Sequence, residues 1–315
     1  MEPTTPPLNL NHLRLFLAVA RHGSVTGGAA SLYVSQPSVS RAIHELERDV
    51  GMALLERVGR GVRLTDAGRT LADYAEQLFG TADAARRAMD ELRGLSVGRL
   101  RIGASTTIGI YLLPRVLGQF HARHPEIALA SEVGNTARVV DMLRAFAVDL
   151  VLVEGPVADD ELVVESFGSD ELVLLAPPGH PFAAAGEIAP EALETVPFLA
   201  REPGSGTREV VDAALSAHGI TPVLAMELGH TEAIKQGIIA GLGLSILSRL
   251  TVERELRDGA LVPVAMRGVS IARRLWLARR RGVEPSPAAR AFLELLDERR
   301  QSDSSGPSSD REMTH

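Results

Sequence analysis

Residues 24–47 read SVTGGAASLYVSQPSVSRAIHELE and contain two short helical patterns with a break between them. Ser24 is a good N-cap for the first pattern, and Ser35, with Pro37 in the turn that follows, is a good N-cap for the second. The second pattern keeps its apolar spacing up to a stop at Gly51. Two helices joined by so short a connection are typical of a helix-turn-helix unit.

The flanking segments extend this unit in both directions. Before it, apolar residues at helical spacing from Leu13 end at Gly23, which predicts a first helix. After it, residues 54–64 read LLERVGRGVRL and predict a small hairpin with a Gly-containing turn. We therefore expect a winged helix-turn-helix domain at 10–64, preceded by a flexible N-terminus at 1–9.

A long helical pattern follows the hairpin. Thr65 is its N-cap, and apolar residues recur every three or four positions to about Leu95. A helix of about 30 residues spans ~45 Å, and a lone apolar stripe of that length needs a partner. We expect residues 65–98 to form a linker helix that pairs two copies of the chain.

Charge and composition restrict the function. The formal net charge is −7, but residues 1–64 hold seven Arg against five acidic residues, so only the front of the chain is suited to phosphates. Lys235 is the single lysine, which excludes a phosphate loop ending in Gly-Lys-Ser/Thr. The absence of cysteine excludes disulfides, iron–sulfur clusters, thiolate zinc sites and Cys nucleophiles. With no signal-like segment and no bilayer-spanning apolar run, we expect a soluble cytoplasmic protein that makes no membrane contact.

From Arg99 onward, short apolar strands alternate with helices, which predicts mainly parallel sheets covered by helices on both faces. The predicted strands lie at 100–103, 129–133, 149–153, 171–175, 198–200, 224–228 and 243–247. Crossovers near 167–169 and 266–269 would join two lobes with a cleft between them. We assign lobe I to 99–167 and 268–301 and lobe II to 168–267, and we expect the polar tail 302–315 to be disordered.

Hydroxyl-rich turns precede several helices of these lobes. They are Ser105-Thr106-Thr107, Gly204-Ser205-Gly206-Thr207 and Thr231-Glu232. The N–H groups and partial positive charge of a helix N-terminus attract anions. Each turn alone is most simply an N-cap, but their position at strand ends in both lobes favours an anion clamp facing the cleft.

Further candidates lie at neighbouring strand ends. Asn135-Thr136 forms another strand-to-helix turn, Glu154 follows the strand at 149–153, and His230 precedes Thr231. Glu154 either accepts a hydrogen bond from a protonated ligand or pairs with a neighbouring Arg. His230 either senses charge or is a neutral, hydrogen-bonded histidine.

The front of the chain closely resembles the LysR-type transcriptional regulators. The resemblance rests on LRLFLAVARHGSV at 13–25, SQPSVSR at 35–41 and LTDAG at 64–68, and it covers roughly residues 10–297. It implies a multidomain fold: an all-α winged helix-turn-helix, a linker-helix dimer, and an inducer domain of periplasmic-binding-protein type (type II-like) made of two Rossmann-like α/β lobes. It also implies promoter DNA as a partner, tetramers as a common assembly, and RNA polymerase as a possible contact.

The helix beginning at Ser35 fits a DNA-reading role because polar side chains on a rod can enter the major groove. We assign base-edge reading to Gln36, Ser38 and Arg41, phosphate contact to Ser35, Ser40, Arg57, Arg60 and Arg63, and Pro37 to the same turn. One departure from the family is Gly27-Gly28 inside the second helix, where each glycine costs about 1 kcal/mol relative to Ala and would soften that helix.

The segments GASTTIG at 103–109, EGP at 154–156, REPGSGTRE at 201–209 and ELGHTEAIK at 227–235 resemble most the subgroup linked to sulfur assimilation, and next the regulators of carbon-fixation operons. This resemblance suggests a small anionic effector, either a sulfur oxyanion or a phosphorylated metabolite. Since no metal-ligand spacing appears in the sequence, we expect no cofactor and no metal.

The hypotheses that the chain is an enzyme or a solute-binding protein have less support from the sequence. Gly204-Ser205-Gly206 is not a Gly-x-Ser-x-Gly elbow, and no His-Glu-x-x-His motif occurs. A periplasmic solute-binding protein would need an export signal.

Overall fold

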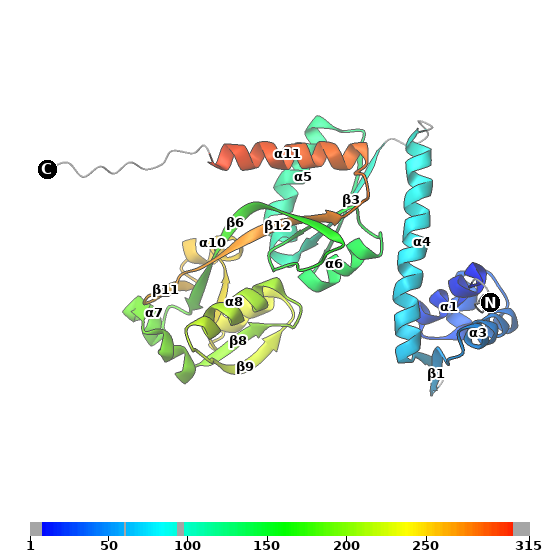
Figure 1. Cartoon of the computed structure of the whole chain (residues 1–315). Coiled ribbons are helices and arrows are strands. Elements are labelled where there is room, and N and C mark those ends of the chain that lie inside the picture. The colour runs from blue at the N-terminus through cyan, green and yellow to red at the C-terminus, as the bar shows by residue number, and fades with distance from the viewer. Residues whose placement is uncertain (1–7, 60, 93–97, 305–315) are drawn as a thin grey trace. The chain divides into compact units, whose positions relative to one another are not determined.

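The computed structural model describes residues 8–59, 61–92 and 98–304. The chain divides into one unit at residues 1–89 and another at 90–315, which are described here one at a time (Figure 1). None of the helices in the described ranges is long and apolar enough to cross a bilayer.

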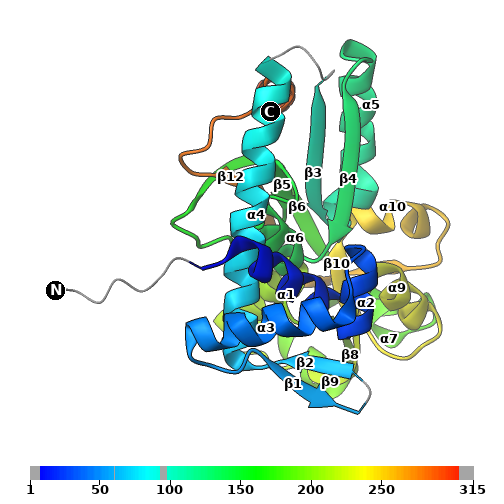
Figure 2. The ribbon, with the colours of Figure 1, turned by 90° about the vertical axis from the view of Figure 1, so that its right-hand side faces the viewer.

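The first unit contains the predicted helix-turn-helix and wing. Its elements are α1 (Leu10–His22), α2 (Val25–Ser31), α3 (Gln36–Val50), β1 (Leu55–Val58), β2 (Gly61–Leu64) and the start of α4 (Asp66–Leu92). Asn9, Ser24 and Ser35 cap the first three helices with their side chains. The hairpin β1–β2 is antiparallel (Figure 2). Leu55 pairs with Leu64 in its register.

Some predicted boundaries differ from the structure. Asn9 lies within the predicted flexible N-terminus but caps α1, because its side chain accepts hydrogen bonds from backbone N–H groups of the first turn. Helix α2 ends at Ser31, and the backbone of Tyr33, two residues later, lies in the left-handed region at φ 56°. Helix α4 ends at Leu92, and the remainder of the predicted helix up to Leu95 lies outside the described residues.

One apolar core holds the first unit together. It contains Leu13, Phe16, Val19, Ala29, Val39, Ile43, Leu46, Leu54, Ala72 and Ala75, contributed by all four helices and the wing. Gly28 of α2 is part of this packing, since a Cβ built there would lie 2.8 Å from the Cα of Val19. Gly28 therefore has a packing role in addition to its cost in helix propensity: its lack of a side chain lets α2 approach the backbone of α1.

The second unit is built on a mixed sheet in the order β4-β3-β5-β12-β6-β11-β7, with β10 also paired to β6 and β8–β9 forming a separate pair. The strands are β3 (Arg99–Ser105), β4 (Ala128–Gly134), β5 (Leu150–Val153), β6 (Leu162–Ala176), β7 (Glu187–Ile188), β8 (Pro197–Arg201), β9 (Val223–Leu228), β10 (Ser245–Ser248), β11 (Val262–Met266) and β12 (Ile271–Arg280).

The expected parallel pairing is present in only part of this sheet. Within it, β3 is parallel to β4 and β5, and β7 is parallel to β11; the separate pair β8–β9 is also parallel. β6 pairs antiparallel with β10, β11 and β12. β6 and β12 are long strands that run in opposite directions, and both connect the two lobes. The predicted strand at 171–175 is the last part of β6.

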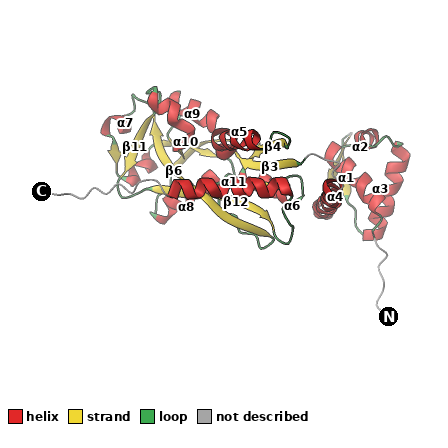
Figure 3. Cartoon of the chain, turned by 90° about the horizontal axis from the view of Figure 1, so that it is seen from above, coloured by secondary structure: helices red, strands yellow, loops and turns green. Residues whose placement is uncertain are grey.

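Helices cover both faces of these strands (Figure 3). They are η1 (Ile108–Leu112), a π-helical turn, then α5 (Leu113–Arg123), α6 (Thr136–Arg144), α7 (Pro181–Ala185), η2 (Pro190–Thr195), α8 (Gly206–Ala217), α9 (Thr231–Ile239), α10 (Arg249–Arg257) and α11 (Pro287–Ser304). Helix α11 extends into the tail predicted to be disordered; residues 305–315 of that tail lie outside the described residues.

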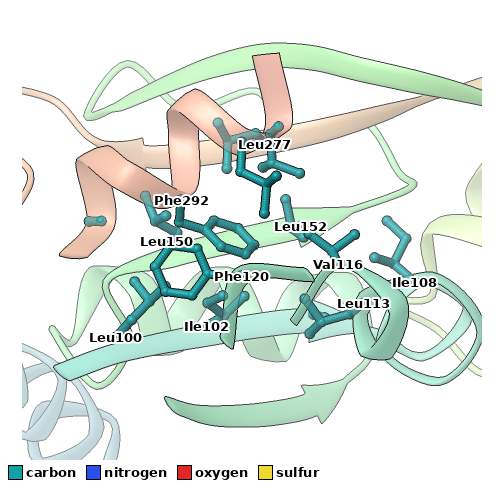
Figure 4. Packing of buried hydrophobic residues seen from close by; sticks show 14 of the residues in the cluster. Leu100, Ile102, Ile108, Leu113, Val116, Phe120, Leu150, Leu152, Leu277 and Phe292 are labelled. Carbon is teal, nitrogen blue, oxygen red and sulfur yellow. The ribbon is translucent and has the colours of Figure 1, made fainter. Parts of the chain in front are cut away.

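The core of lobe I shows how distant segments meet. Phe120 of α5 packs edge to face against Phe292 of α11, with ring centroids 5.5 Å apart (Figure 4). Leu100, Leu150 and Leu277, from β3, β5 and β12, complete the contact. The chain therefore returns to lobe I after forming lobe II, and the two connecting strands pass between the lobes.

Candidate functional site

Helix α3 presents a polar first turn above a buried apolar face. Val39, Ala42, Ile43 and Leu46 are buried, whereas Ser35, Gln36, Pro37, Ser38 and Arg41 are exposed and Ser40 is half-buried. The Ser35 hydroxyl caps the helix and lies 2.7 Å from the Ser38 hydroxyl. The predicted base-reading side chains Gln36, Ser38 and Arg41 are therefore exposed on the first two turns of α3.

The wing contributes exposed arginines. Arg57 and Arg63 are both exposed, and Arg63 donates from Nε to Glu56 at 2.8 Å. Arg60, also predicted to contact phosphate, lies outside the described residues. A phosphate at Arg63 would have to compete with Glu56 for the guanidinium.

In lobe I, two hydroxyls of the first predicted turn are already engaged. Ser105 and Thr106 donate to the backbone carbonyls of Leu152 and Gly134, at 3.4 and 3.1 Å. Because each hydroxyl has one proton, neither can also donate to an anion in this arrangement. Thr107 is buried and forms a hydrogen bond to Glu154.

Glu154 lies at the end of β5 and is 3% exposed. Its Oε1 is 3.9 Å from Nη1 of Arg273, and its Oε2 has no hydrogen-bond partner among the described residues. Burial raises the pKa of Glu154 above its ordinary value, and Arg273 and the hydrogen bond from Thr107 only partly oppose this rise. Glu154 is thus a buried carboxyl that gives up its proton less readily than an exposed glutamate does.

Two buried arginines orient hydroxyls in lobe II. Arg273 of β12 donates from Nη1 to the Thr207 hydroxyl at 2.8 Å, and Arg201 of β8 donates from Nη1 to the Thr231 hydroxyl at 3.0 Å. A hydroxyl that accepts from a guanidinium keeps its own proton to donate. Thr207 and Thr231 are therefore set up as donors, which suits an anionic ligand.

The cationic side chains near these turns are paired with carboxylates. Arg273 contacts Asp170 at 2.6 Å, and Arg201 makes a two-pronged contact with Glu202 at 2.8 and 2.9 Å. Lys235 is paired with Glu232 and Glu255 at 2.9 and 2.7 Å. Burial alone would lower the pKa of Lys235, but hydrogen bonds to Glu255 and Glu232 raise it, so this lysine stays charged and engaged.

The turns of the two lobes touch at two glycines. A Cβ built on Gly206 would lie 2.5 Å from the backbone nitrogen of Gly155 and 2.7 Å from Oγ1 of Thr136. Oγ1 of Thr136 is buried and has no hydrogen-bond partner within the described part of the chain. Asn135 caps α6, and the backbone N–H of Ala137 donates to the carbonyl of Gly204 at 3.2 Å.

The structure thus brings most predicted effector residues into one region. Thr107, Glu154 and Thr207 are linked through Arg273, and Thr136 lies beside Gly206, whose neighbour Ser205 caps α8. Thr231 belongs to the same region because it accepts a hydrogen bond from Arg201, whose charge acts on Glu154. His230 is exposed at the N-cap of α9 and makes no side-chain cap bond, so it stands apart from this group.

Three residues that organise this region were not predicted: Arg201, Asp170 and Arg273. Arg273 could have been found, since side chains in β12 alternate between buried and exposed, and Arg273 falls on the buried face with Ile271 and Leu275. A charged residue in phase with a buried apolar face indicates a buried ion pair. Its partner Asp170 comes from β6, about a hundred residues earlier, and no local pattern reveals that pairing.

Known families match both units. The family of bacterial regulatory helix-turn-helix proteins of lysR type matches residues 10–69, and the LysR substrate binding domain matches residues 93–301. A RuBisCO operon transcriptional regulator of Allochromatium vinosum is 39% identical over 289 residues, covering 92% of this chain and 95% of the relative. The uncharacterized HTH-type transcriptional regulator YeiE of Escherichia coli K12 is 37% identical over 290 residues, covering 92% and 97%.

Among solved structures, the regulatory domain of CcmR from Synechocystis PCC6803, in complex with 2-PG, matches with 33% identity and a TM-score of 0.61. The match covers 65% of this chain and 98% of that domain. A helix-turn-helix unit followed by a two-lobed α/β effector-binding domain defines a ligand-controlled transcriptional regulator. The chain belongs to the LysR family of bacterial transcriptional regulators.

Proposed function

We propose that two copies of this chain bind one promoter site through α3 and the wing, and that a small anion bound between the lobes controls this binding. The observation that supports the anion most directly is the pair of hydroxyls, Thr207 and Thr231, that buried arginines hold as donors. The regulator would work in the cytoplasm, where promoter DNA and RNA polymerase are its partners.

Pairing of two copies is supported by α4. Tyr74 and Leu78 on this helix are 66% and 41% exposed, although both are large apolar side chains. Tyr74 also lines a hollow of about 440 Å³, together with Val50, Met52, Leu54, Asp66, Ala67, Thr70 and Leu71. We infer that α4 of a second copy covers this surface. Leu78→Asp should convert dimers or tetramers to monomers in sedimentation, and Asp73→Asn on the same helix should not.

The DNA contact is tested with the upstream region of the chain's own gene. Arg41→Ala should weaken the salt-sensitive gel shift, because it removes an exposed guanidinium from the first turns of α3. Arg48→Ala, an exposed arginine near the end of the same helix, is the matched control. Unchanged binding by Arg41→Ala would contradict the assignment of α3 as the reading helix.

The effector class follows from the donors and from a relative. The CcmR regulatory domain was solved with 2-PG, a phosphorylated two-carbon acid, and we propose a small phosphorylated or sulfur oxyanion for this chain. Calorimetric titration with 2-phosphoglycolate, inorganic phosphate, sulfite and sulfate should identify a binder. Thr207→Ala should lower its affinity, whereas Thr195→Ala, an exposed threonine elsewhere in lobe II, should not. Equal affinities in both variants would contradict the site.

A further inference from the structure

Three buried polar atoms in the site have no hydrogen-bond partner within the described residues. They are Oε2 of Glu154, Oγ1 of Thr136, which lies beside Gly155, and Nη2 of Arg273, which is held in an ion pair with Asp170. An unsatisfied buried polar group costs about 1–3 kcal/mol, so the two oxygens, which have no ion-pair partner at these atoms, indicate that a ligand atom completes their bonding.

The charges around Glu154 decide which form of its carboxyl is compatible with an anion. The groups that act on it are Arg273 from β12, Arg201 from β8, Asp170 from β6 and the Thr107 hydroxyl. Both arginines already contact other carboxylates, Asp170 at 2.6 Å and Glu202 at 2.8 Å. An ionised Glu154 would therefore add an unbalanced negative charge beside the incoming anion.

A neutral Glu154 has the opposite effect. Its carboxylic acid O–H is a donor, like the hydroxyls of Thr207 and Thr231, and every one of these donors is neutral. Burial, the main influence on the pKa of Glu154, favours this neutral form. Similar sites keep a carboxylic acid protonated so that it can donate a hydrogen bond to a developing or bound anion.

We propose that Glu154 binds the effector oxyanion as a neutral carboxylic acid, with one proton held between its Oε2 and an oxygen of the anion. This inference rests on the proposed anion site. Free Glu154 that has ionised must recover a proton from solvent when the anion binds, so binding is linked to proton uptake. The effector is then a fully ionised oxyanion that accepts hydrogen bonds from four neutral groups: Glu154, Thr136, Thr207 and Thr231.

The test is calorimetric titration of the full chain with 2-phosphoglycolate at pH 7, 8 and 9, in two buffers of different ionisation enthalpy at each pH. The second ionisation of a phosphate monoester has a pKa of about 6 and is nearly complete at pH 8, so protons taken up at pH 8 or 9 belong to the protein. Once Glu154 is ionised in the free protein, uptake should approach one proton per bound anion, and the affinity should fall about tenfold for each further pH unit.

Variants separate this effect from general charge effects. Glu154→Gln keeps an N–H donor but cannot ionise, so it should bind 2-phosphoglycolate with no proton uptake and with an affinity that does not change from pH 7 to 9. Glu132→Gln, at an exposed position of β4, should behave like the unmodified chain.

The outcomes distinguish two kinds of failure. Anion binding without proton uptake, at a pH where the free chain has released the Glu154 proton, overturns the role of Glu154 and leaves the anion site in place. If no oxyanion binds at any of these pH values, the anion site and the inference both fall. Proton uptake by the unmodified chain decides the matter even if Glu154→Gln fails to fold.

Discussion

The guanidinium of Arg273 lies 2.6 Å from the carboxylate of Asp170, and each of these side chains is only 1% exposed. Nε of Arg273 donates to the same carboxylate oxygen at 2.8 Å, and the Ser248 hydroxyl donates to the other oxygen at 3.0 Å. The pair joins β12 to β6, the two strands that pass between the lobes. It therefore connects the stability of the domain to the position of Thr207.

Removing one partner of this pair should strongly destabilise the effector domain. Arg273→Met leaves a buried, charged Asp170, and breaking a buried pair in this way typically costs about 3–5 kcal/mol. Urea unfolding should show this loss. The double variant Arg273→Met/Asp170→Leu should recover most of it, because no charge is left unpaired. A single variant as stable as the unmodified chain would show that Asp170 is satisfied without Arg273.

The contact between Gly206 and Gly155 makes a second prediction. Gly206→Ala places a Cβ 2.5 Å from the backbone nitrogen of Gly155, so the turns of the two lobes must separate. Overpacking of this kind costs about 1–3 kcal/mol, and the displaced Thr136 and Thr207 should bind 2-phosphoglycolate more weakly.

The control for this prediction is Gly118→Ala in α5, where an added Cβ meets no atom within 4 Å. That change should stabilise the domain by about 0.5–1 kcal/mol through helix propensity and should not alter titration. Equal titrations for Gly206→Ala and Gly118→Ala would mean that this contact plays no part in binding.

Local patterns predicted the helix-turn-helix, the wing and most strands, because caps and apolar periodicity act within a few residues. Ser24 and Ser35 cap α2 and α3 as expected. The antiparallel pairing of β6 with β12 could not be predicted in this way, because Leu162 and Arg280 pair across more than a hundred residues of chain. Pairing at that separation depends on tertiary packing rather than on local propensity.

For the candidate site, local patterns predicted the positions of the turns but not the hydrogen-bond partners of their hydroxyls. Hydroxyl-rich turns mark helix N-termini, so Thr107, Thr136 and Thr207 could be proposed from the sequence. Whether a threonine of these turns keeps a hydroxyl proton for a ligand depends on partners elsewhere in the chain. Thr106 donates its proton to the carbonyl of Gly134, whereas Thr207 accepts a hydrogen bond from Arg273. Only the three-dimensional arrangement distinguishes these two threonines.

For the substitution Gly28→Ala, packing and helix propensity predict changes of opposite sign in the stability of the first unit. Propensity alone favours Ala over Gly by about 1 kcal/mol inside a helix. A Cβ at Gly28 would nevertheless lie 2.8 Å from both the Cα and the N of Val19, so Gly28→Ala should destabilise the first unit by about 1–3 kcal/mol and weaken DNA binding. Thermal unfolding and gel shift would measure the two effects.

Ala30→Gly is the matched control at an exposed position of the same helix, α2. It should lower stability by only about 1 kcal/mol, as propensity requires. A gain of stability in Gly28→Ala would instead show that α1 and α2 can move apart without loss.

The last prediction concerns the pH dependence of stability. The pKa of Glu154 is raised in the folded chain from an ordinary value near 4.5, chiefly by burial. Below that ordinary value both states are protonated and folding carries no penalty. As the pH rises above it, the unfolded chain releases the Glu154 proton while the folded chain retains it. Stability therefore falls with rising pH until the folded pKa is reached, and the lost contribution is constant beyond it.

Glu154→Gln cannot ionise and should lack this decline. Relative to the variant, the unmodified chain should lose up to about 1.4 kcal/mol of unfolding free energy per pH unit within that window. Urea unfolding of both proteins without ligand, in half-unit steps from pH 5 to 8, measures the difference directly. Curves that stay parallel across the range would mean that Glu154 ionises as readily in the folded chain as in the unfolded one, and a buried neutral acid at this position would be contradicted.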